Sequence, residues 1–218
     1  MRLLACLLLS ASSALAAPFA VQVGDARLAL DAPPGFADVQ ATGSPRLLEL
    51  AEALTSASNR ILLFALEDAD VRRFSQGDSP ELRRYVIAVT PKSLESARVQ
   101  LSAFQGLVAD ALREVGPPVP ASTDLRRYLD AQPRGQPALV AELRKDQDVV
   151  AVLQGARLPD APRSRDPRYL LSTMTLMLVR GKALSLAIYS SYTAEADLEW
   201  IRGTTLRWIE ELQRLNLR

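Results

Sequence analysis

Carboxylates are the side chains of this sequence whose spacing first suggests chemistry. The segment LEDAD places Glu67, Asp68 and Asp70 within four positions, and carboxylate oxygens are ligands that Ca²⁺ prefers. The glycine and the terminal glutamate of an EF-hand loop are absent here, which favours a solvated turn. Paired carboxylates could also cleave a glycosidic bond, but that reaction depends on a separation in space that a sequence does not define. Metal binding by Asp68 or Asp70 and glycan hydrolysis therefore both stay open.

Other catalytic groups are scarce. The chain has no histidine and one cysteine, Cys6, so serine-histidine relays are excluded. The run from Gly77 to Pro80 (GDSP) begins like a serine hydrolase motif but forms no G-x-S-x-G elbow, which favours a loop turn. No lysine follows a serine by three positions, and the pair Gly181-Lys182 lacks the rest of a phosphate-binding loop. No cofactor is expected.

The start of the chain, MRLLACLLLSASSALAA, is typical of a signal peptide. Arg2 supplies the positive charge before a short apolar run. Cys6 lies within that run with only five residues before it, whereas a lipid-modified cysteine must follow the whole apolar segment. The run is also shorter than the ~20 residues that span a bilayer. We therefore expect a cleaved leader and not an anchor.

Cleavage is expected after Ala16, where the small residues of the A-L-A run suit a signal peptidase. The mature chain would begin at Ala17 and form one globular domain over residues 17–218, without a transmembrane segment. It would be periplasmic, with secretion as the alternative, and would contain neither cysteine nor histidine. Loss of Arg2 leaves 25 basic and 25 acidic side chains. This neutrality makes nucleic acid an unexpected partner.

Alternation and turn signals predict the elements of the first half. Phe19, Val21 and Val23 alternate before a Gly24-Asp25 turn, which indicates a β-hairpin. The apolar run RILLFAL is typical of a strand covered on both sides. The expected elements are a hairpin over 19–30, a helix from Ser44-Pro45 to Asn59, strands over 60–66 and 83–90, and a helix from Thr90-Pro91 to Val115.

The middle of the chain is less regular. Proline and glycine interrupt residues 116–137, which predicts an excursion from the domain that holds a short helix over 123–131. Residues 138–143 fit a helix or a strand equally, whereas 148–158 indicate a strand. An exposed loop is expected over 161–168, with Arg163, Arg165 and Arg168.

The last fifty residues have the clearest pattern. Two long apolar segments flank Arg180-Gly181-Lys182 and predict a hairpin, and the first of them is apolar on both sides and needs cover on both faces. Thr193 is expected to cap a final helix with Glu195 and Asp197 in its first turn. The apolar stripe of that helix comprises Leu198, Ile201, Thr205, Trp208, Leu212 and Leu215.

Strands joined by hairpins with amphipathic helices between them predict a largely antiparallel sheet flanked by helices on both faces, an α-β-α sandwich of the α+β class. The opening hairpin with LDAPPGF and the closing LVRGKALSLAIYSSYTAEADLEWIRGTTLRWIEEL resemble exported bacterial proteins related to the PsbP, Mog and DcrB fold group. The resemblance covers both ends, about half of the chain. It implies association without catalysis, because photosystem stabilisation, small-GTPase binding and phage adsorption all occur in that group. No functional residue of the group maps onto a matching motif here.

The surface offers two hints of a partner. Arginine pairs suit carboxylate or phosphate groups, although solvated faces and ion pairs explain most such pairs. Trp200 lies on the flank of the final helix's apolar stripe, where it could anchor an interface or pack against a loop. The candidate partner surface comprises Arg72, Arg73, Arg83, Arg84 and Trp200; a third pair is Arg126-Arg127.

The sequence therefore favours a non-catalytic periplasmic binding or accessory protein that associates with an envelope protein or an anionic envelope component. The alternative is a carboxylate-dependent hydrolase of envelope glycans. Peripheral membrane attachment is a third reading, and the mixed charges of the final helix do not favour it.

Overall fold

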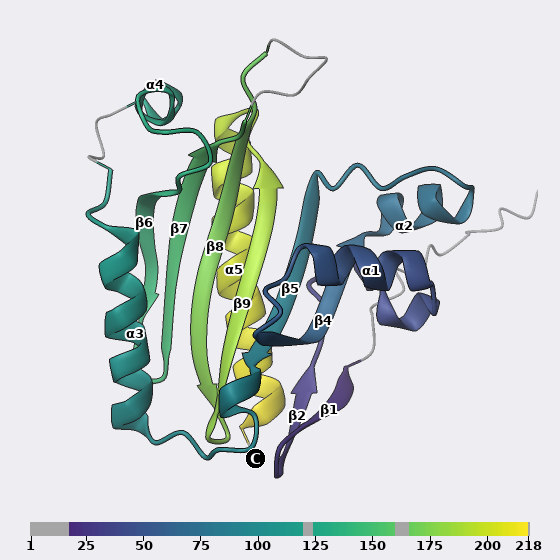
Figure 1. The fold of residues 1–218 in the computed structure, drawn as a ribbon, viewed down its shortest axis with the longest axis vertical. Helices are drawn as coiled ribbons and strands as arrows, with labels where there is room; N and C mark the ends of the chain where they lie inside the picture. Colours follow the sequence, from purple (N-terminus) through teal and green to yellow (C-terminus); the bar gives the residue numbers. More distant parts are fainter. Residues whose placement is uncertain (1–17, 120–123, 160–165, 218) are drawn as a thin grey trace, which may run out of the picture.

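The computed structural model describes residues 18–119, 124–159 and 166–217, and it contains a seven-stranded antiparallel sheet with helices on both faces (Figure 1). The strand order is β3-β4-β5-β9-β8-β7-β6. The strands are β3 (Phe36–Asp38), β4 (Asn59–Glu67), β5 (Arg84–Pro91), β6 (Ala138–Lys145), β7 (Val149–Arg157), β8 (Tyr169–Val179) and β9 (Lys182–Ser191). The predicted α-β-α sandwich is thus confirmed.

The helices form two layers. Helices α1 (Pro45–Ala53), α2 (Asp68–Ser75) and α3 (Leu101–Val115) lie in front of the sheet in Figure 1, and α5 (Glu195–Asn216) lies behind it. The short helix α4 (Leu125–Asp130) packs at the end of β7. The hairpin of β1 (Phe19–Val23) and β2 (Ala26–Leu30) forms a separate two-stranded sheet that packs against α5.

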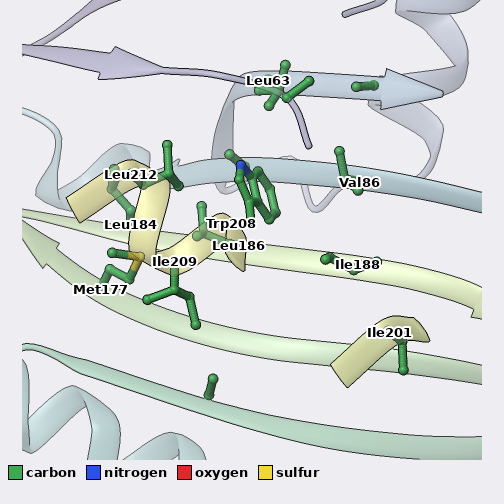
Figure 2. Packing of buried hydrophobic residues seen from close by; sticks show 14 of the residues in the cluster. Leu63, Val86, Met177, Leu184, Leu186, Ile188, Ile201, Trp208, Ile209 and Leu212 are labelled. Atoms are coloured by element: carbon green, nitrogen blue, oxygen red, sulfur yellow. The ribbon is translucent and has the colours of Figure 1, made fainter. Parts of the chain in front are cut away.

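The main core lies between α5 and the sheet. Ile201, Trp208 and Leu212 point from α5 onto β5, β8 and β9, as Figure 2 shows. Trp208 is 3% exposed, so its ring is part of the core. The buried stripe of α5 differs from the predicted one at its edges, because Ile209 and Thr204 are buried while Leu198 and Leu215 are only half-buried.

Several predicted boundaries were wrong. α1 ends at Ala53, not at Asn59, which begins β4. The Thr90-Pro91 pair does not start a helix, because β5 keeps pairing with β4 through Pro91 and Asn59. A 3₁₀ turn over 92–94 follows, and α3 begins only at Leu101.

In other segments the structure decides between alternatives that the sequence left open, or differs from the prediction. Residues 138–145 form a strand, β6, whose register is shifted twice by irregularities. The LEDAD segment is not a solvated turn, since α2 begins at Asp68. Ala194, not Thr193, occupies the N-cap of α5. The leader with its Ala16/Ala17 cleavage site, and Arg163 and Arg165 of the predicted loop, lie outside the described residues.

The front face of β8 and β9 is only partly covered. Leu176 and Leu178 pack against α3, whereas Leu170 and Met174 on the same face of β8 are half-buried and belong to no core cluster. The prediction that the first strand of this hairpin, β8, has cover on both faces therefore holds fully only for the face beneath α5.

A candidate binding groove beside the last helix

The candidate site lies between the last helix, α5, and the loop after β2, residues 31–34. Hydrogen bonds hold this loop against α5. Trp208 donates its indole N–H to the carbonyl oxygen of Asp31 at 2.8 Å. Near the end of the helix, Asn216 bonds to both the amide (3.0 Å) and the carbonyl (2.8 Å) of Ala29 in β2. These bonds fix the segment after β2, residues 31–34, at a set distance from the helix.

Between this segment and α5 lies a groove of about 740 Å³, which we call the α5 groove. Its lining includes two tryptophans and three prolines, of which Trp208 and Pro33 are buried behind the surface, and charged side chains of α5 rim it. The lining residues are Pro18, Asp31, Ala32, Pro33, Pro34, Trp200, Thr204, Arg207, Trp208, Glu210, Glu211 and Arg214. An apolar centre with a polar rim is the usual anatomy of a protein-binding surface.

Two predicted partner residues, Arg84 and Trp200, meet at one end of the groove. The guanidinium carbon of Arg84 lies 4.0 Å from the centre of the Trp200 ring, and the Phe36 ring lies 6.1 Å away. Trp200 is half-buried and lines the groove, so it both packs against neighbours and faces the open volume.

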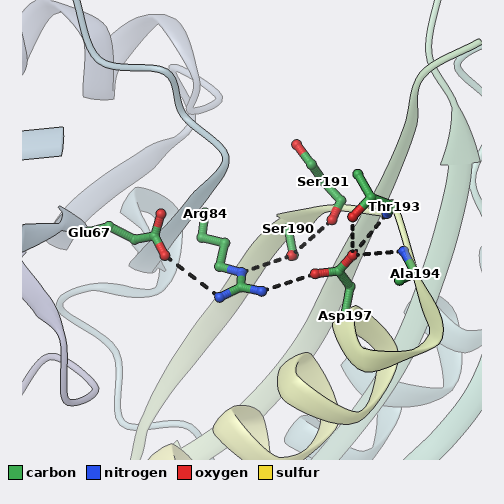
Figure 3. A network of polar contacts seen from close by, with 7 residues as sticks. All are labelled: Glu67, Arg84, Ser190, Ser191, Thr193, Ala194 and Asp197. Carbon is green, nitrogen blue, oxygen red and sulfur yellow. Dashed lines mark hydrogen bonds and ion pairs between the residues drawn. The ribbon is translucent and has the colours of Figure 1, made fainter. Parts of the chain in front are cut away.

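Arg84 is not free to bind an anionic ligand. It bonds to Asp197 at 3.0 Å, lies 3.8 Å from Glu67, and contacts the hydroxyl of Ser190 at 3.4 Å (Figure 3). The arginine thereby links β4, β5, β9 and α5 while it lies over the ring of Trp200. These contacts fix the guanidinium against the Trp200 ring.

Asp197 completes this network and the start of α5. Burial alone would raise the pKa of its carboxyl, but hydrogen bonds from Thr193, Ala194 and Arg84 outweigh burial and lower that pKa to about 2. Its Oδ2 accepts from the Thr193 amide (2.9 Å), the Thr193 hydroxyl (2.8 Å) and the Ala194 amide (3.0 Å). Asp197 therefore supplies the capping interaction that the sequence pattern assigned to Thr193.

The remaining predicted arginines do not gather at the groove. Arg73 pairs with Glu81. Arg72 and Arg83 are exposed, and neither makes an ion pair within the described ranges. Arg126 of the third pair stacks near Tyr192, with 5.4 Å from guanidinium carbon to ring centre.

Sequence reasoning missed the acidic and proline side of the groove. Asp31, Pro33 and Pro34 lie in the LDAPPGF segment, and Arg207 and Glu210 follow the flank of the buried stripe on which Trp200 was noticed. Extending that flank along the helix at steps of three and four would have found the helical wall. No feature of the sequence predicts that this helical wall lies opposite residues 31–34.

Two carboxyls of the groove have pKa values moved in opposite directions. Desolvation by burial raises the pKa of Asp31, and the Glu211 charge adds to this. A hydrogen bond from Arg214 lowers the pKa of Glu211. Such a split is typical of acid-base pairs. Asp31 is half-buried, and its Oδ1 is buried and has no hydrogen-bond partner in the described chain.

Asp70, in the acidic segment that suggested a metal site, has structural contacts. Asp70 is 4% exposed, and its two oxygens accept the amides of Glu81 (3.1 Å) and Leu82 (3.0 Å). Within the described residues, no group of three or more Asp or Glu side chains could hold a metal ion.

Lys182 is the most deeply buried charged side chain among the described residues, at 1% exposure. Its ammonium donates to the carbonyls of Glu95 (3.1 Å) and Ala97 (2.9 Å) and contacts Asp25 at 2.7 Å. The amine therefore has three oxygen partners within the fold, which hold it in place.

Comparison with known proteins gives limited matches. No family model and no curated protein matches the chain. It is similar to two solved structures, one titled the Mog1 E65A mutant and the other the Saccharomyces cerevisiae Ran-binding protein Mog1p, at 12% and 11% identity. Each match covers 93% of this chain and 94% of the other, with TM-scores of 0.39 and 0.38. No helix in the described part of the chain is long and apolar enough to cross a membrane.

Proposed function

We propose that the chain is an exported, non-catalytic accessory protein that holds another envelope protein in the α5 groove. The single observation that carries this proposal is the groove itself, an apolar volume of about 740 Å³ between tryptophan and proline walls with a charged rim. Tryptophan and arginine are the residues most often central to binding energy at interfaces. Removal of the leader and a periplasmic location, with secretion as the alternative, belong to the same proposal.

A protein partner fits the groove better than an anionic envelope component. Three carboxylates and two guanidiniums line it, so it has no excess of positive charge. The arginines that could attract an anion, Arg72 and Arg83, do not line it.

A pull-down from intact envelopes tests the proposal. Three baits are compared. They are the mature chain and two variants that each reverse one charge on α5, Arg207→Glu in the groove and Arg202→Glu outside it. Both arginines are exposed, so both variants should fold like the wild type. We expect one envelope protein to be recovered by wild type and Arg202→Glu but not by Arg207→Glu. Equal recovery by both variants, or recovery of nothing, would overturn the proposal.

A carboxylate-dependent hydrolase is the second candidate, and the opposed pKa shifts of Asp31 and Glu211 in one groove favour it. The buried Oδ1 of Asp31 weighs against it. Purified peptidoglycan incubated with wild type and with Asp31→Asn separates the two. Release of soluble glycan by wild type and not by Asp31→Asn would replace the accessory role with a hydrolase.

A further inference from the structure

The walls of the α5 groove limit what kind of segment it can hold. Its lining residues on α5 recur at steps of three and four from Trp200 to Arg214. Fourteen residues of helix rise about 21 Å, so the groove follows α5 for about four turns. A segment that fills the groove from end to end is therefore also about 21 Å long.

The groove offers few main-chain donors. Of its five lining residues outside α5, three are prolines, Pro18, Pro33 and Pro34, which have no N–H. The main chain of α5 is bonded within the helix, and the indole N–H of Trp208 is already bonded to Asp31. An extended segment would leave main-chain groups unpaired, at about 1 to 3 kcal/mol for each one that is buried. A helix avoids this loss because its main chain is bonded internally.

The rim carries two charges without an ionic partner in the described chain. Glu211 pairs with Arg214, whereas Arg207 and Glu210 are exposed and make no ion pair there. Arg207 contacts only the hydroxyl of Thr204, at 3.5 Å, among the hydrogen bonds of the described residues. Arg207 and Glu210 are one turn apart, so a helix beside α5 can meet both charges with one acid and one base spaced by one turn.

We infer that the α5 groove binds an amphipathic helix of the partner protein, which lays an apolar stripe between the tryptophan and proline walls and sets an acid against Arg207 and a base against Glu210. This inference rests on the proposed function and names the partner element. The binding mode is a helix in a groove, with anchors at positions i, i+3 or i+4, and i+7.

Photocrosslinking in living cells tests the inference. A benzoylphenylalanine replaces Pro34, which is exposed and lines the groove, or Arg214 at the far end; Glu199, exposed on α5 but outside the groove, is the control position. We expect adducts from Pro34 and Arg214, and none from Glu199, to one segment of one protein. Partner residues captured from the same groove position should be separated by three or four positions, and the sites captured from Pro34 and from Arg214 should lie about three to four helical turns apart on the segment.

A synthetic peptide of the captured segment then tests the helix and the charges. We expect it to gain helical circular dichroism on binding the mature chain, and a central proline to abolish binding. Arg207→Glu should weaken binding about tenfold or more, and reversal of the opposing acid in the peptide should restore it.

The possible outcomes separate this inference from the proposed function. Groove-dependent capture of a segment whose crosslinks are spaced by two, or of a proline-rich segment, would overturn the helix and leave the accessory role standing. Adducts to a glycan or lipid, or no adduct from either groove position, would overturn both.

Discussion

Replacing Lys182 with methionine is expected to lower the free energy of unfolding by about 2 to 4 kcal/mol. Methionine keeps most of the buried stem but removes three donors, two of which bond to the carbonyls of Glu95 and Ala97. Hydrogen bonds from a charged donor contribute about 1.5 to 3 kcal/mol each. Part of that sum is offset because the variant no longer buries an ammonium.

The ion pair with Asp25 should matter much less than its 2.7 Å distance suggests. The Asp25 side chain is 72% exposed, so water replaces the ammonium when Lys182 is removed. Asp25→Asn, which keeps the shape of the side chain, is the matched control and should hardly change stability. Urea unfolding followed by tryptophan fluorescence measures both variants. The reasoning fails if Asp25→Asn is as destabilising as Lys182→Met, or if Lys182→Met is neutral.

Two further predictions concern α5. The pKa of Asp197 is lowered from 3.8 to about 2, so its contribution of about 2 to 3 kcal/mol is present above pH 4 and is lost as the pH falls towards 2. Asp197→Asn should remove that part of the acid dependence of urea midpoints, and an unchanged pH slope would contradict the assignment. Trp208→Ala should destabilise the chain by about 3 to 5 kcal/mol, because the ring is 3% exposed and its N–H holds Asp31. A loss below 1 kcal/mol in the same assay would show that the ring is not central to the core.

Local patterns predicted the elements whose signals are local. The β8-β9 hairpin follows from two long alternating runs around Arg180-Gly181, and its register places Val179 opposite Lys182 as a tight turn requires. The same logic failed at Thr90-Pro91, where a helix-start signal competes with pairing to Asn59. Asn59 and Pro91 are 32 positions apart in the chain, and no local rule accounts for a pairing at that separation.

The candidate site was predictable only in part, for a related reason. Trp200 was recognisable from its place beside the buried stripe, and Arg84 from its pairing with Arg83 along the chain. That Arg84 lies over the Trp200 ring depends on β5 being adjacent to β9, which a sequence without a known strand order does not state. The groove has walls at residues 31–34 and 200–214, and their proximity depends on the hairpin packing against α5.

The way this hairpin is held has a consequence for binding. Asp25 at its turn contacts Lys182, Ala29 in its second strand bonds to Asn216, and Asp31 after it bonds to Trp208. Contacts at three points therefore hold the loop wall of the groove against α5 and the β8-β9 turn. The wall is formed before a partner binds. Binding to a preformed groove avoids the loss of entropy that ordering a loop would require. Variants that loosen these contacts, such as Lys182→Met, should therefore weaken partner binding although they change no residue of the groove. The effect should be mainly a slower on-rate, because only a fraction of the molecules then has the loop wall in place.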